Sequence, residues 1–236
     1  MIRFAKTLLL AGAVLIVANP ATGQVGHDPD NTPFRDLRYR QLGSVFGGYF
    51  TGGKGITGAG PADGPVVGVR WEFKLGRGPI TGYGSVAGAL MERDLLNPDE
   101  PPETRVFQTV NQRMVMVTGG LEMVLTGRKT WNGFAPYVGA GTGITVGLEV
   151  PQDSVFSFGN KLHFSPNIGV RAFAGRNFHF RLEARDVLWR LKYPTGFRST
   201  PANDPTADPI LTADQPQAEW VHHPVFIFAI GFTLRE

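Results

Sequence analysis

Polar or charged side chains alternate with apolar ones along residues 178–185 of the stretch 178–189, which reads Phe-His-Phe-Arg-Leu-Glu-Ala-Arg-Asp-Val-Leu-Trp. Successive side chains of a β-strand point to opposite faces, so Phe180 and Leu182 would share one face and Arg181 and Glu183 the other. A helix would scatter both sets around its axis. This stretch therefore predicts a strand with one apolar face and one charged face.

The same alternation recurs, less regularly, in other segments that are separated by turn residues. The eight predicted strands cover about residues 41–50, 65–75, 80–93, 112–125, 134–150, 162–174, 178–189 and 222–235. The 31 Gly and 18 Pro residues suit strands joined by turns better than helices. We therefore expect an all-β protein whose strands form one barrel-sized domain, residues 41–236.

The first 23 residues have the pattern of an export signal. Arg3 and Lys6 precede a short apolar run at residues 8–18, and Ala21-Thr22-Gly23 offers a small-residue cleavage site. We interpret residues 1–23 as a signal peptide and the polar residues 24–40 as a mobile periplasmic leader, with a short turn of helix at 34–40. No later segment approaches the roughly 20 apolar residues of a spanning helix, so a membrane form would have to cross with strands.

Charge and composition exclude several classes of function. Without Arg3 and Lys6, 21 basic residues face 20 acidic ones, which is no basic footprint for nucleic acid. The chain has no Cys, which excludes disulfides and thiolate metal sites. His222 and His223 are adjacent and would point to opposite faces of a strand, so they are poorly placed to share a metal ion. We expect neither a metal nor a cofactor.

The predicted connections alternate in length. Those after the first, third, fifth and seventh strands are long and polar, whereas those after the second, fourth and sixth are short and contain Gly-Arg. Up-and-down membrane barrels have short periplasmic turns and longer outer loops. The pattern therefore predicts an eight-stranded antiparallel up-and-down transmembrane β-barrel with both termini in the periplasm.

In such a barrel the apolar rows would face lipid and the charged rows would face the interior. The reverse orientation would place Arg181 and Arg185 in lipid, at about 2–4 kcal/mol each near the midplane. The interior of eight strands is only wide enough for side chains, and buried charges persist when they are paired. We expect an interior ion network, with inward Gly139, Gly141 and Gly143 leaving room for it, that plugs the barrel. Its predicted members are Arg70, Glu72, Glu122, Arg171, Arg181, Glu183 and Arg185.

Aromatic residues near the strand ends are expected to lie at the two membrane interfaces. The predicted girdle residues are Trp71, Phe73, Phe134, Phe178, Trp189 and Phe232. Asp186 falls on the apolar row of residues 178–189. We therefore expect either a bulge near Asp186-Val187 or a position of Asp186 at the membrane rim.

These features together resemble the small eight-stranded outer-membrane β-barrels of Gram-negative bacteria, similar to the OmpA transmembrane domain and OmpX. The resemblance covers residues 41–236 and includes Pro-Tyr-Val-Gly-Ala-Gly at 136–141, Arg-Leu-Glu-Ala-Arg-Asp at 181–186 and the aromatic last strand. It implies an outer-membrane location in contact with outer-membrane lipid and lipopolysaccharide, and insertion by the barrel-assembly machinery. It implies an architecture and leaves the activity and the oligomeric state open.

One pair of residues has a catalytic pattern. His163 and Ser165 are two apart in a predicted strand and so share a face, as a base and a nucleophile must. The pair resembles the His-x-Ser of outer-membrane lipid A deacylases, although Pro166 stands where that family has Asn. Both side chains would face the interior, which favours a non-enzymatic structural or surface-interaction role. A deacylase-like hydrolase, a small pore and a lipocalin-like carrier remain alternatives.

Overall fold

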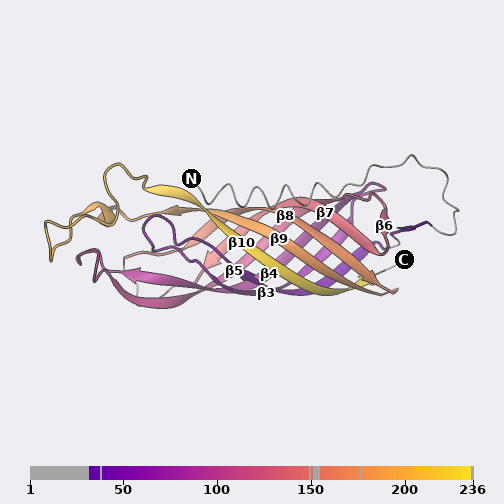
Figure 1. Ribbon diagram of the computed structural model, residues 1–236, viewed down its shortest axis with the longest axis horizontal. Coiled ribbons are helices and arrows are strands. Elements are labelled where there is room, and N and C mark those ends of the chain that lie inside the picture. The colour runs from indigo at the N-terminus through magenta and orange to yellow at the C-terminus, as the bar shows by residue number, and fades with distance from the viewer. Residues whose placement is uncertain (1–31, 38, 149, 151–154, 176, 235–236) are drawn as a thin grey trace. The chain divides into compact units, whose positions relative to one another are not determined.

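The computed structural model describes residues 32–37, 39–148, 150, 155–175 and 177–234. The predicted signal peptide and most of the predicted leader lie outside these residues. The described part forms one antiparallel sheet of ten strands (Figure 1). Two strands are short, β1 (Phe34–Asp36) and β6 (Lys129–Trp131). The long strands are β2 (Gln41–Phe50), β3 (Gly64–Lys74), β4 (Ile80–Leu96), β5 (Val106–Val124), β7 (Phe134–Gly147), β8 (Asn160–Ala174), β9 (Phe178–Lys192) and β10 (Ala218–Leu234).

The eight long strands close into a ring. Each pairs antiparallel with the next long strand along the chain, and β10 returns to pair with β2 from Val225↔Phe50 to Leu234↔Gln41. Ring closure leaves no free edge along the closed part of the sheet. The predicted eight-stranded antiparallel up-and-down barrel is confirmed.

Apolar side chains cover the outside of the ring. One outward row runs from strand to strand through Val45, Val69, Val86, Val117 and Ile144, each of which is paired in register with the next. All five side chains are exposed, because no other layer of the described residues covers this face. A water-soluble barrel would place such a row in its core.

The connections lie at the two ends of the ring as expected. Residues 75–79, 125–133 and 175–177 join strands at one end, the turn end, and residues 51–63, 97–105, 148–159 and 193–217 join them at the other, the loop end. The expected loop at residues 94–111 is wrong in extent, because β4 and β5 continue to Leu96 and from Val106 with a bulge between Leu95 and Leu96. The Asn-Pro step at residues 97–98 and the Pro-Pro step at residues 101–102 favour a loop, and both lie within the shorter connection 97–105.

The expected helical turn at residues 34–40 is also wrong. Phe34–Asp36 is strand β1, which pairs antiparallel with β6 at the turn end, beside the right-hand end of the barrel in Figure 1. The chain then returns to the ring, where Leu37 N donates to Arg128 O at 2.8 Å and Arg40 N to Leu234 O at 3.2 Å. These two hydrogen bonds join the segment to the sheet.

The barrel interior has two layers. Charged and polar side chains fill the half near the turn end, including Arg70, Glu72 and Glu122. Apolar side chains such as Met91, Met114 and Trp189 fill the half near the loop end and join buried residues of the loops in one core.

Candidate functional site

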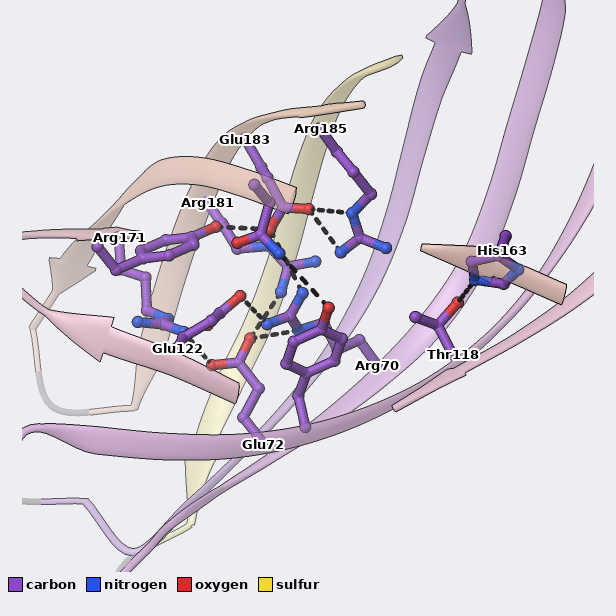
Figure 2. Close-up of polar contacts among 12 residues, drawn as sticks. Arg70, Glu72, Thr118, Glu122, His163, Arg171, Arg181, Glu183 and Arg185 are labelled. Carbon is purple, nitrogen blue, oxygen red and sulfur yellow. Dashed lines mark hydrogen bonds and ion pairs between the residues drawn. The ribbon is translucent and has the colours of Figure 1, made fainter. Parts of the chain in front are cut away.

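Seven charged side chains meet in the interior, and they are the seven singled out from the sequence (Figure 2). They come from β3, β5, β8 and β9, on inward positions of each strand. The Arg70, Arg171 and Arg181 side chains and all three glutamates are fully buried, and Arg185 is 8% exposed. Charges so deeply buried are tolerated only when they are paired and hydrogen-bonded.

Each glutamate bridges at least two arginines. Glu72 lies 2.9 Å from Arg70 Nε, 2.7 Å from Arg171 Nη2 and 2.6 Å from Arg181 Nη1. Glu122 pairs with Arg70 and Arg171. Glu183 accepts from Arg185 Nη2 at 2.6 Å and lies 3.3 Å from Arg70 Nη1. The result is one connected network, not a set of separate ion pairs.

Two tyrosines and two glycines complete this network. The Arg70 guanidinium lies 3.6 Å from the centre of the Tyr83 ring, and Tyr137 donates to Glu183 Oε2 at 2.7 Å. A Cβ at Gly139 would lie 2.6 Å from Glu122 Cγ, and one at Gly141 would collide with the Tyr83 hydroxyl. The inward glycines therefore make the space that the long side chains occupy.

His163 and Ser165 lie inside the barrel and are not joined to each other. His163 Nε2 lies 3.0 Å from Thr118 Oγ1 (Figure 2). Its Nδ1 lies 2.9 Å from Thr145 Oγ1, so a hydroxyl group contacts each ring nitrogen. The Ser165 side chain is completely buried and its oxygen has no hydrogen-bond partner among the described residues. The nearby carboxylate of Glu183 pairs with Arg70 and Arg185. This geometry offers neither an activated nucleophile nor access for a lipid.

The predicted interface position of Trp189 is wrong. Trp189 is completely buried, with its ring centre 4.1 Å from that of His223 and 5.4 Å from that of Phe158. The inward row of β9 continues without a break from Arg181 through Arg185 to Trp189. Trp189 therefore shares the inward face of β9 with Arg181 and Arg185, but it lies nearer the loop end, where the interior is apolar.

The other predicted girdle residues lie on the outer face. Trp71, Phe73, Phe134, Phe178 and Phe232 are all exposed. The Trp71 and Phe232 rings pack edge to face with centres 6.3 Å apart. These five residues belong to β3, β7, β9 and β10, near the turn end of the barrel.

Asp186 and His222 form a pair on the outer face of β9 and β10. His222 Nδ1 lies 2.6 Å from Asp186 Oδ2. Because the register of β9 with β8 is the same on both sides of Asp186, no bulge is present there. His223 points inward, where its Nε2 lies 2.7 Å from Pro61 O. The two histidines point to opposite faces, as expected for neighbours in a strand.

The apolar layer near the loop end was not anticipated from the sequence. It contains Trp189, Leu191 and Met91 from the strands and Phe158 and Phe197 from the loops. Burial and a hydrogen bond to Glu219 raise the pKa of Tyr193, which also lies in this core, so its hydroxyl stays a neutral donor. Together these side chains close the loop end of the barrel.

Two long loops are joined above this core. Arg105 Nη2 donates to Asp208 O at 2.6 Å, and Asn203 Nδ2 donates to Glu100 Oε1 at 2.7 Å. Residues 97–105 and 193–217, which we call the loop surface, contain six acidic and two basic residues, a formal charge of −4. Hydrogen bonds from Thr206 and Thr212 lower the pKa values of Asp204 and Asp214, so both stay ionised to lower pH than ordinary carboxyls.

No group of three or more His, Asp or Glu side chains among the described residues is arranged to hold a metal ion. None of the helices in the described part of the chain is long and apolar enough to cross a membrane.

Comparisons with known proteins identify the fold. No protein-family model matches the chain, and no curated protein matches it in sequence. The structure is similar to that of Neisserial surface protein A, with a TM-score of 0.51 and 8% identity over 82% of this chain and 97% of that one. It also aligns with Ail, the attachment invasion locus protein of Yersinia pestis, solved with the heparin analogue sucrose octasulfate. That alignment has a TM-score of 0.40 and 10% identity over 84% of this chain and all of that one.

Proposed function

We propose that this chain, which has the fold of the small eight-stranded outer-membrane β-barrels, resides in the outer membrane of a Gram-negative bacterium with its turn end in the periplasm. It acts there without catalysis, through the loop surface. In this setting the apolar outer face of the barrel contacts lipid and lipopolysaccharide. The barrel-assembly machinery inserts the chain into the membrane. The observation that carries the proposal is the sealed interior beneath joined, acidic loops.

The interior supports a surface role over the alternatives. A pore needs a water-filled path, but paired charges fill one half of the barrel and an apolar core fills the other. A lipocalin-like carrier needs an apolar cavity open to a ligand, whereas Trp189, Phe158 and Phe197 fill that space. A deacylase needs a nucleophile that lipid can reach, and Ser165 is completely buried. The loop surface remains as the accessible functional region.

The membrane location can be tested on the outward valine row. Val86 is exposed on β4 between Val69 and Val117, so arginine there would face hydrocarbon. We expect Val86→Arg to lower the free energy of unfolding by about 2–4 kcal/mol in phospholipid vesicles. Urea titration monitored by tryptophan fluorescence measures this loss. Thr104→Arg, on an exposed loop residue, is the control, and equal losses in the two variants would contradict the membrane location.

The surface role can be tested through the charge of the loops. Asp99, Glu103 and Asp208 are exposed on the loop surface, and no side-chain hydrogen bond of theirs holds the loops. An octalysine peptide is expected to bind the wild type in nanodiscs, and the Asp99→Asn/Glu103→Gln/Asp208→Asn variant to bind it about tenfold more weakly. The affinity should also fall with salt, because exposed charges are screened.

The peptide titration has a matched control at the opposite end of the barrel. Asp36→Asn removes an exposed carboxylate from β1 and should leave octalysine binding unchanged. Unchanged affinity in the triple variant, or an equal loss in the Asp36 variant, would contradict the role of the loop surface.

A further inference from the structure

A small ribbon extends the sheet at the turn end. Strand β1 pairs with β6 through Phe34↔Trp131 and Asp36↔Lys129, and β6 continues into β7 through Trp131↔Phe134. Paired residues of neighbouring strands present their side chains to the same face. Phe34, Trp131 and Phe134, which are 43%, 53% and 46% exposed, therefore form an aromatic row across three strands.

Basic side chains lie at the same end of the barrel as this row. The exposed basic residues of the turn end are Arg35, Arg40, Arg77, Arg128 and Lys129, and Lys74 is half-buried. Asp36 is the one acidic residue among the described residues of 34–40, 74–80, 125–134 and 174–178, which leaves a formal charge of +5. Arg38, Arg176, Arg235 and Glu236 lie outside the described residues. The turn end and the loop surface thus carry opposite charge.

Contacts to the ring hold the ribbon in place. Lys74 Nζ donates to Leu37 O at 2.7 Å and lies 4.3 Å from the centre of the Tyr39 ring. Tyr39 is buried and stacks on Phe173 with ring centres 5.5 Å apart. The ribbon, which carries the aromatic row and Arg35 and Lys129, is therefore attached to the barrel rim.

We propose that the β1–β6 ribbon binds the headgroup of an anionic phospholipid in the periplasmic leaflet. Aromatic side chains prefer the headgroup level of a membrane, and Lys and Arg next to it attract anionic lipids. A soluble polyanion would contact the basic groups alone, whereas a phospholipid would also cover the exposed aromatic row. The inference rests on the proposed membrane location and is independent of the loop surface.

Trp131 provides the test, because it belongs to the ribbon. The full mature chain is reconstituted in phosphatidylcholine vesicles that contain, at equal mole fraction, either brominated phosphatidylglycerol or brominated phosphatidylcholine. The quenching of Trp131 is the difference between the wild type and Trp131→Phe. One engaged Lys or Arg is worth about fivefold in local lipid preference. We therefore expect brominated phosphatidylglycerol to quench Trp131 several-fold more strongly in the wild type, and both lipids to quench it equally in Arg35→Gln/Arg128→Gln/Lys129→Gln.

A matched variant and the remaining tryptophans separate the outcomes. Arg190→Gln/Lys192→Gln/Arg198→Gln removes three exposed basic groups near the loop end and should keep the preference. Equal quenching in the wild type, a preference that survives in the ribbon variant, or its loss in the loop-end variant would overturn the proposal. If neither brominated lipid quenches Trp71, the membrane location itself is contradicted. If the triple ribbon variant does not fold, Arg128→Gln and Lys129→Gln are measured singly against the same criteria.

Discussion

Replacing Glu122 with alanine is expected to lower the free energy of unfolding by about 3–5 kcal/mol, the usual loss when one partner of a buried ion pair is removed. Glu122 pairs with both Arg70 and Arg171, whose side chains are fully buried. Its removal leaves two carboxylates to neutralise four guanidinium groups in a space with little room for water. The loss therefore reflects an uncompensated buried charge as well as missing contacts.

Urea unfolding in phospholipid vesicles, followed by tryptophan fluorescence, measures the loss in Glu122→Ala. Glu103→Ala serves as its control, because Glu103 is exposed on the loop surface and should change stability by no more than about 0.5 kcal/mol. A loss below about 1 kcal/mol in Glu122→Ala would mean that water or rearranged partners compensate the two arginines. The connected interior network would then be incorrect.

Truncating Trp189 to alanine is expected to destabilise the barrel by a similar amount, about 3–5 kcal/mol. The indole is completely buried between His223 and Phe158, so its removal leaves a cavity where strands and loops meet. The cavity lies in the apolar half of the interior and would also loosen the seal at the loop end.

Circular dichroism in a urea titration follows this variant without depending on the deleted fluorophore. Trp220→Ala is the matched control, since Trp220 is 58% exposed on the outer face of β10 and leaves no enclosed cavity. Equal destabilisation of the two variants would contradict the burial of Trp189 and restore its assignment to the girdle.

The barrel could be predicted from sequence because its outer face is uniformly apolar over most strands. That face sets the period of two, and the lengths of the connections then set the strand order and the two ends. Once the apolar face of each strand is known, alternation alone predicts the inward positions of the charged residues, such as Arg70 and Glu122. Which glutamate meets which arginine depends on the stagger of strands that are far apart in sequence, so the pairs themselves could not be predicted.

Sequence contrast fails where both faces of a strand are apolar. Near the loop end, inward residues such as Met114 and Val187 are as apolar as the outward ones, so the second layer of the interior had no signal. The girdle prediction for Trp189 is wrong because it followed the residue type. Trp189 is an even number of residues from Arg181 and Arg185, so alternation places it on their inward face. Strand β1 has only three residues, too few for a period to be recognised.

The pairing of β2 with β10 determines when the barrel can close. It joins residues 41–50 to residues 225–234, so almost the whole chain must be delivered before the seam can form. Contacts so distant in sequence form slowly, because a long segment must first be confined. Until then β2 and β10 are two unprotected edges that can pair with other chains. During assembly the sheet therefore has two free edges, which remain exposed until β10 pairs with β2.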